Sequence, residues 1–352
     1  MACEVEYKRS RYRSSYSRMV KQRITFIAVL LVALFALLLL NISIGSSDIS
    51  FMEVCRVLLM DEGMGNNAMI IRNIRLPMAL MAVVVGASLG IGGCQIQTIL
   101  RNPIASPYTL GISAAASFGA AMGLILNQSV LKLSDTMAVT TNAFVFSLMA
   151  AIAIYIFSLQ RGIGKNAIIL FGVALNFLFS ALTMIMQYIA DEDQLQGLIF
   201  WSFGSLLKTT WTKFYVVLCV LSVCFFIVMK YAWQLTAMTL DDTKASSLGV
   251  DTAKVRRIVI LMTSMLSAVA VSFVGTIGFV GLISPHIARQ LVGEDQRFFM
   301  PLSGLLGAFV LSLSFVLSKL VIRGVILPIG LVTSVIGIPF FILIIFSKMR
   351  SM

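Results

Sequence analysis

The stretch GFVGLISPHIARQLVG, residues 278–293, holds the residues with the clearest capacity for chemistry. His286 is the only histidine in the chain, and it follows Pro285 directly, three residues before Arg289. A zinc site is disfavoured, because zinc takes three or four protein ligands and the nearest carboxylate, Glu294, follows the stretch. Proline has no N–H, so one backbone carbonyl loses its helical donor, and His286 could hydrogen-bond that carbonyl. We favour this structural role for His286 over gating or proton response, and both over catalysis.

The composition places these residues in a membrane protein. Hydrophobic residues make up 59% of the chain and charged residues 12%, with a mean hydropathy of +0.97. Soluble domains contain about 25% charged residues. The five cysteines are scattered without a CxxC pair, so we predict no disulfide framework and no structural zinc. We also expect no permanently bound cofactor. An all-α polytopic membrane protein is the expected fold class, because helices satisfy their own backbone groups in lipid.

Apolar runs of roughly 20 residues recur along the chain, and each is long enough to cross a bilayer as a helix. We predict ten such spans, which is an even number, so both termini should lie on the same side of the membrane. Two runs, 106–126 and 278–292, are short and interrupted by Gly and Pro, which is typical of partial or broken spans. The ten predicted spans are 25–45, 76–98, 106–126, 138–158, 167–190, 214–235, 257–275, 278–292, 302–320 and 327–347.

The basic residues indicate the orientation. The chain has 27 Lys and Arg, a formal net charge of +12, and a cluster of them in residues 1–24, directly before the first apolar run. A basic segment in this position marks the cytoplasmic side of the membrane and is attracted to anionic lipid. We therefore predict a basic cytoplasmic tail over 1–24, cytoplasmic termini and no nucleic-acid partner.

An internal repeat relates two parts of the predicted transmembrane domain, 25–350. RLPMALMAVVVGASLGIGGCQIQTILRNP and RIVILMTSMLSAVAVSFVGTIGFVGLISP align without gaps at an offset of 182 residues. Five predicted spans separate the two copies, so the second runs in the opposite direction, as in transporters with inverted-topology repeats. The repeat halves cover about 70–190 and 250–350. The aligned pairs are Arg75 with Arg257, Gly93 with Gly275, Leu100 with Leu282, Pro103 with Pro285, and Gly111 with Gly293.

Transporters with such repeats build their pathway from interrupted helices at the repeat interface. The alignment predicts one interruption at Pro103 and the other at Pro285. His286 and Arg289, which would follow the second interruption, are candidate gating residues.

Eight ordered stretches resemble the FecCD family, the permease subunits of ABC importers for iron–siderophore complexes, haem and cobalamin. The matching stretches are RLP (75–77), RNPIASPYTLGIS (101–113), FGVALN (171–176), FWSFGSL (200–206), SSLGV (246–250), GFVGLISPHIAR (278–289), GEDQR (293–297) and LPIGLVTSVIGIPFF (327–341). The resemblance implies a homodimer, or a paralogous heterodimer, of ten-helix permeases in the bacterial inner membrane. It also implies two cytoplasmic ATP-binding subunits and an extracytoplasmic substrate-binding protein.

The chain itself is not expected to be an enzyme. GIGKN at 162–166 lacks the Ser or Thr and the spacing of a phosphate-binding loop, so a partner must hydrolyse ATP. An intramembrane enzyme would need clustered catalytic side chains within spans, and an ion-coupled carrier would need buried carboxylates there. Neither feature occurs in the predicted spans.

The resemblance assigns three sites. Arg75 matches an arginine that meets acidic residues of the binding protein, Arg72 could replace a second arginine where Met78 stands, and Lys319 occupies the place of a third. The alternative is that these cations only anchor helix ends. The loop at 238–257 corresponds to the segment that fits a cleft on the ATPase, with Gly249 allowing a tight turn. Its candidate contact residues are Asp241, Asp242, Ser246, Leu248, Gly249 and Val250.

The third site is the pathway, for which Asn176 and Gln187 are the polar candidates on the fifth span. The expected function is import of a ferric siderophore by alternating access, driven by the partner ATPase. Haem and cobalamin are the alternative cargoes.

Overall fold

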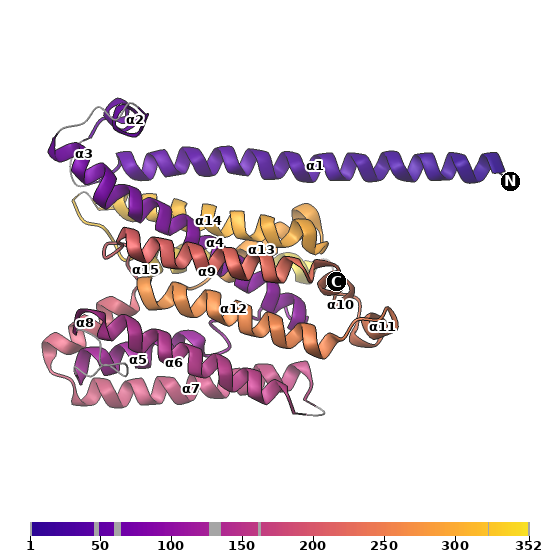
Figure 1. The fold of residues 1–352 in the computed structure, drawn as a ribbon. Coiled ribbons are helices and arrows are strands. Elements are labelled where there is room, and N and C mark those ends of the chain that lie inside the picture. Colours follow the sequence, from indigo (N-terminus) through magenta and orange to yellow (C-terminus); the bar gives the residue numbers. More distant parts are fainter. Residues whose placement is uncertain are drawn as a thin grey trace.

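The computed structural model describes residues 2–45, 49–59, 65–126, 135–160, 163–322 and 324–350, and within these ranges every regular element is helical (Figure 1). This confirms the predicted all-α class. The elements are α1 (Ala2–Ser43), α2 (Phe51–Leu59), α3 (Asn66–Ile70), the π-helical turn η1 (Ile71–Arg75), α4 (Leu76–Leu100), α5 (Ile112–Ile125), α6 (Asp135–Ser158), α7 (Lys165–Ile189), α8 (Glu192–Ser202), α9 (Trp211–Met229), α10 (Ala232–Met238), α11 (Asp242–Ser247), α12 (Thr252–Val274), α13 (Val280–Val292), α14 (Gln296–Leu320) and α15 (Ile329–Arg350).

Each predicted span corresponds to a helix, but the helices are of two kinds. Among the described residues, seven helical segments are long and apolar enough to cross a membrane, and they include parts of α1, α4, α6, α7, α9, α12 and α14. The remaining three spans correspond to α5, α13 and α15. At 14 and 13 residues, α5 and α13 are about 20 Å long and fall short of a core of about 30 Å. The non-helical segments before them must complete each crossing.

Helix α4 runs through the middle of the bundle, and nearly all of its side chains are buried. It packs against α14, α12 and α13, while α5, α6 and α7 form a second group that α12 joins to the first through α6 (Figure 1). The pairing of α4 with α14 therefore has a counterpart in the pairing of α12 with α6. Each copy thus packs its first helix on the third helix of the other, as two copies related by a pseudo-two-fold axis can do.

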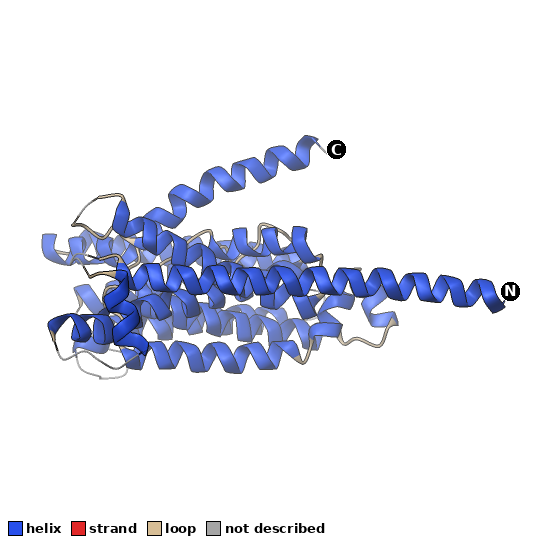
Figure 2. Ribbon diagram, turned by 90° about the horizontal axis from the view of Figure 1, so that it is seen from above, coloured by secondary structure: helices blue, strands red, loops and turns tan. Residues whose placement is uncertain are grey.

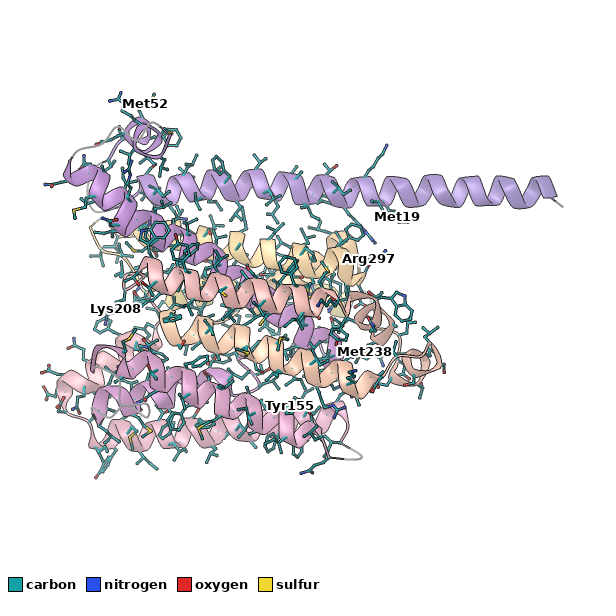
Figure 3. All side chains as sticks on the ribbon, viewed as in Figure 1. Met19, Met52, Tyr155, Lys208, Met238 and Arg297 are labelled. Atoms are coloured by element: carbon teal, nitrogen blue, oxygen red, sulfur yellow. The ribbon has the colours of Figure 1, made fainter. Side chains whose placement is uncertain are left out.

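The two ends of the bundle differ in the elements they carry. Both chain termini, α10 and α11 lie at one end, and α2, α3 and α8 lie at the other, which we call the outer end (Figure 1). Met52 and Lys208 mark the outer end, and Met238 and Arg297 lie toward the opposite end (Figure 3). Seen from above, α1 projects beyond the bundle and α15 diverges from it toward the C-terminus (Figure 2). The shared end of the termini agrees with an even number of spans.

The interruptions of the bundle lie at residues 101–111 and 275–279. The first contains Pro103, as predicted. The second ends before Pro285, which lies inside α13, so the prediction that Pro285 breaks the second copy is wrong. The chain turns instead at Gly275 and Phe279, whose φ angles are +77° and +66°. Pro285 is the sixth residue of α13, so it removes the hydrogen bond to the carbonyl of Gly281, but the helix continues through it.

The ungapped register between the two copies is wrong for the same reason. Helix α4 stays helical through Gly93 to Leu100, whereas Gly275 follows the last residue of α12. The repeat is therefore visible in the order and packing of the helices rather than in residue pairs 182 apart. His286 lies in the second turn of α13 and not directly after a break.

Candidate coupling site and transport cavity

The predicted coupling loop, 238–257, follows the short helix α10 and contains the short helix α11 and the start of α12, at the end that carries the termini. Asp241 is the N-cap of α11, and its carboxylate accepts hydrogen bonds from the Asp242 N–H at 2.9 Å and from the Thr243 hydroxyl at 3.0 Å. Acidic residues at a helix start are favoured by the partial positive charge there. The local sequence thus explains why a helix begins at this point.

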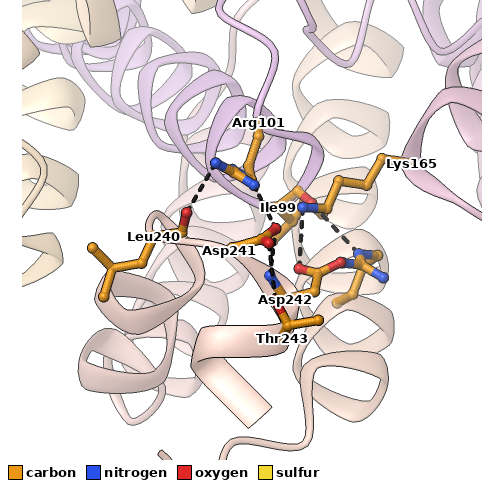
Figure 4. A network of polar contacts seen from close by, with 8 residues as sticks. Ile99, Arg101, Lys165, Leu240, Asp241, Asp242 and Thr243 are labelled. Atoms are coloured by element: carbon orange, nitrogen blue, oxygen red, sulfur yellow. Dashed lines mark hydrogen bonds and ion pairs between the residues drawn. The ribbon is translucent and has the colours of Figure 1, made fainter. Parts of the chain in front are cut away.

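The two aspartates at the start of α11 are fastened to three spans by cations (Figure 4). Arg101, directly after α4, pairs with Asp241 at 2.8 Å. Asp242 pairs with Lys165, the first residue of α7, at 3.1 Å and with Arg256, in α12, at 2.8 Å. The ends of α4, α7 and α12 are therefore linked to one another through α11.

Both aspartates are ionised at neutral pH. The Thr243 hydroxyl and the Asp242 N–H lower the pKa of Asp241, and the charge of Arg101 adds to this effect. Partial burial opposes ionisation of Asp242, but the hydrogen bond from Lys165 and the charge of Arg256 outweigh it and lower its pKa. A carboxylate with a lowered pKa contributes its stabilisation above the ordinary value near about 3.9 and loses it as the pH falls through the lower folded-state pKa. Coupling should therefore change little between about pH 5 and 8.

The far side of α11 is free to contact a partner. Ser246, Leu248 and Gly249 are exposed, and Gly249 takes a φ of +82° that closes the turn. An apolar side chain such as Leu248, 53% exposed at the tip of a polar loop, fits insertion into a groove. Val250 is only 5% exposed and packs in the main core, so it anchors the loop and the prediction of a contact role for it is wrong.

The sequence analysis missed a buried polar network behind the coupling segment. The Gln296 side chain accepts a hydrogen bond from Gln95 at 3.0 Å and donates one to the Thr98 hydroxyl at 2.9 Å. Its backbone N–H donates to the Thr236 hydroxyl of α10 at 3.0 Å. Gln296 therefore ties α10 to α4 inside an apolar region, where hydrogen bonds between polar groups are strong. The Oε1 atom of Gln95 has no partner among the described residues. The signal was present in Gln95 and Thr98 of the stretch CQIQT (94–98), which are three residues apart and therefore share one helix face.

At the outer end, the predicted docking cations hold the last turn of α1. Arg75, 6% exposed, donates from Nη1 to the carbonyls of Ile42 and Ser43 at 2.8 and 2.7 Å. Lys319 donates to the carbonyl of Asn41 at 2.6 Å, and its Nζ lies 3.9 Å from the centre of the Phe315 ring. Cations at a helix C-terminus satisfy unpaired carbonyls and favour the helix dipole. This geometry favours the alternative that the two residues anchor α1.

Arg72 has a similar placement. It is half-buried, and its Nη2 donates to the carbonyl of Val57 in α2 at 3.0 Å. Among the described residues at this end, Arg56 and Lys208 are exposed cations. Docking by Arg72, Arg75 and Lys319 stays a prediction.

Replacing Arg75 separates anchoring from docking. We expect Arg75→Gln to lower the thermal stability of the purified chain without any binding protein, because carbonyls of α1 lose buried donors that are worth about 1–3 kcal/mol each. Fluorescence-detected size exclusion after heating measures this, with the exposed Arg56→Gln as the matched control. Unchanged stability together with weaker binding of the binding protein would restore the docking role.

The polar residues of α13 have partners that differ from the prediction for His286. Pro285 frees the carbonyl of Gly281, and the donor nearest to it is the Gln97 side chain of α4, at 3.5 Å. His286 Nε2 lies 3.0 Å from the Gln290 side-chain nitrogen, one turn further along α13. Arg289 pairs with Glu294 at 3.1 Å, in the turn that leads to α14. A gating role for these residues stays a prediction.

The two interruptions of the bundle meet at a cavity. A space of about 330 Å³ is lined by residues of both non-helical segments and by the starts of α13 and α15. A second space of about 360 Å³ continues from it along α7. The pathway candidates Asn176 and Gln187 both line this second space, together with Ser180 and Thr183.

The elements tied to the coupling helix are the ones that form this cavity. Arg101 opens the segment that leads to the cavity wall at 106–109, and Lys165 begins the helix that carries Asn176 and Gln187. Arg256 lies near the start of α12, whose other end leads into the second interruption. The three attachments of α11 therefore lead to three parts of one cavity wall.

Comparison with known proteins agrees with this geometry. The model of the FecCD transport family matches residues 31–347. The iron-uptake system permease protein FeuC of Bacillus subtilis strain 168 is 31% identical over 336 residues, covering 94% of this chain and 99% of its own length. The molybdate import system permease protein MolB of Haemophilus influenzae is 34% identical over 284 residues, covering 80% of this chain and 82% of its own.

A solved structure described as an inward-facing conformation of a metal-chelate type ABC transporter superposes with a TM-score of 0.80 at 28% identity, covering 92% of this chain and 99% of that one. The family match spans nearly the whole chain, including both interruptions and the coupling helix. The chain therefore belongs to the FecCD transport family and is a multi-pass ABC importer permease of the metal-chelate type, which is non-catalytic and relies on a partner subunit for ATP hydrolysis.

Proposed function

We propose that this permease carries a ferric siderophore complex into the cytoplasm. The observation that supports ATP-driven import is the ionic attachment of α11 to the three elements that form the cavity wall. An ATPase subunit that contacts α11 would be linked through it to the transport cavity. Iron is the proposed metal because an iron-uptake permease is similar over nearly the whole chain.

The proposed assembly contains two permease chains on two ATP-binding subunits in a bacterial inner membrane, with cytoplasmic termini. The side of α7 next to the cavity supports a permease pair, since Phe177, Met184 and Tyr188 are 74%, 65% and 90% exposed there. A second copy related by two-fold symmetry would cover this face and close the pathway between the chains. A binding protein would dock at the outer end on Arg56 and Lys208, joined by the predicted cations where these become accessible.

The proposed cycle follows from the attachments. Closure of the ATPase subunits moves the exposed tip of α11, and its aspartates pull on α4, α7 and α12. These helices shift the segments 101–111 and 275–279, so the cavity opens alternately to the two sides. A rigid wall of helices with two non-helical segments suits such a change, because the segments absorb the backbone rotation.

Uptake in cells tests the cargo. Cells lacking the chain should lose uptake of a radiolabelled ferric siderophore and regain it with the wild-type chain. Haem and cobalamin are measured in parallel, and loss of either one alone would make it the cargo. Molybdate is the fourth substrate, because MolB is a molybdate permease of similar sequence. Unchanged iron uptake with a loss of any other substrate would refute the siderophore proposal.

A further inference from the structure

The cavity between the interruptions has the features of an anion site. The two spaces share the lining residues Tyr108, Ser113, Ser202 and Thr276, so they are continuous. None of the described residues that line either space is an Asp, Glu, Lys, Arg or His. The selectivity of this cavity for a ligand must therefore come from hydroxyl groups, amides and backbone dipoles.

Two helices begin at this cavity with unused donors. In the described part of the chain, the N–H groups of Ser113 and Ala114 at the start of α5 have no hydrogen-bond acceptor, nor has that of Gly281 at the start of α13. The first amides of α15 differ, because those of Ile329 and Gly330 donate to backbone carbonyls at 3.1 and 2.9 Å. Free N–H groups and the partial positive charge of a helix start together attract anions.

The hydroxyl of Ser113 is a second and independent sign of a ligand. Ser113 is only 4% exposed and lines both spaces, yet its hydroxyl has no hydrogen-bond partner among the described residues. Two other hydroxyls of the lining are satisfied, since Thr276 donates to the carbonyl of Ser202 and Ser334 to that of Gly330. A buried hydroxyl that faces a cavity without a partner is available to a ligand.

We infer that this cavity is a binding subsite for anionic oxygen atoms of the transported complex, with Ser113 as its specificity-determining residue. The inference rests on the proposed function and names the charge class of its cargo. A negatively charged chelate would place one edge against the starts of α5 and α13, and a small oxyanion would enter whole. Uncharged chelates gain nothing from the helix dipoles, so the subsite discriminates by charge.

Equilibrium binding to the purified permease–ATPase complex tests this subsite without the binding protein. The probes are a radiolabelled, negatively charged ferric triscatecholate, an uncharged ferric trishydroxamate and molybdate. The wild type should bind the triscatecholate at least about tenfold more tightly than the trishydroxamate. Ser113→Ala should weaken binding of the anionic probe about tenfold and leave the uncharged probe unchanged, because one hydrogen bond to a charged group is lost.

Ser88→Ala is the matched control. Ser88 is also a buried helical serine, but its hydroxyl donates to the carbonyl of Val84 at 2.7 Å and does not line the cavity. This variant should bind all probes as the wild type does. Ser113→Asp, which adds a negative charge, should abolish binding of anionic probes.

The outcomes separate this inference from the proposed cargo. Binding of molybdate that depends on Ser113, with no binding of either ferric complex, would support the anion subsite and refute the siderophore. Equal affinity for the charged and uncharged ferric complexes, or equal effects of Ser113→Ala and Ser88→Ala, would refute the subsite and leave the importer intact. Binding of none of the probes would overturn both.

Discussion

Asp242→Lys should abolish ATP-driven uptake while the permease still inserts into the membrane and assembles with its ATPase. The substitution places a third cation against Lys165 and Arg256, whose side chains are only 17% and 12% exposed. Losing a partly buried pair and adding repulsion costs roughly 1–3 kcal/mol, less than for a fully buried pair because Asp242 is 36% exposed. That is enough to release α11 from α7 and α12 and to lower uptake about tenfold or more.

The measurement compares uptake and ATP hydrolysis in reconstituted vesicles. Hydrolysis should persist without transport, because the exposed tip of α11 is unaltered. Asp251→Asn is the control, since Asp251 caps α12 by accepting a hydrogen bond from the Lys254 N–H at 2.9 Å and asparagine caps equally well. Deleting residues 240–257 should also abolish transport while membrane insertion remains intact. Uptake that survived both changes would show that α11 is not the coupling element.

Gly93→Ala should prevent stable folding, whereas its neighbour Gly92→Ala should be tolerated. A Cβ at Gly93 would lie 1.8 Å from the carbonyl oxygen of Gly281, because α4 and α13 touch through their backbones at this point. At Gly92, the nearest atoms would lie 3.5 Å away, in ordinary contact. Forcing α13 away from α4 costs about 1–3 kcal/mol or more and displaces the wall of the cavity.

The pair of variants isolates packing from helix propensity. Both positions lie in the middle of α4, so alanine gives each the same intrinsic gain of about 1 kcal/mol. Size-exclusion profiles of fluorescent fusions should show monodisperse protein for Gly92→Ala and aggregate or degradation for Gly93→Ala. Equal profiles for the two variants would contradict the close approach of α4 and α13.

The sequence predicted those structural features that depend on residues within one helix. Apolar runs located the spans, and the aspartates of the 238–257 loop marked the start of α11 because capping depends on neighbouring residues. The pairing of Arg101, Lys165 and Arg256 with these aspartates appears only in the structure. The sequence could not show which carboxylates these cations contact, because the cations come from three separate spans.

The features that the sequence did not reveal share one physical cause: they depend on contacts between helices that are far apart in the chain. Pro285 was predicted as a break because it aligns with Pro103 of the first copy, yet α13 continues through Pro285 and the turn is made by Gly275 and Phe279. Arg75 was predicted to dock the binding protein because it matches an arginine of the family, and the sequence did not show that the end of α1 lies over it. Free amides and the unused hydroxyl of Ser113 are likewise properties of assembled helix ends and have no signature in the sequence.

Transport in reconstituted vesicles tests the central claim, that a cavity in this permease is driven through α11. Vesicles containing the chain and its ATPase partner, with ATP inside and binding protein outside, would be supplied with a radiolabelled ferric siderophore. The account predicts accumulation that requires ATP and binding protein and disappears in Asp242→Lys. Accumulation without ATP, or equal accumulation by Asp242→Lys and wild type, would contradict it.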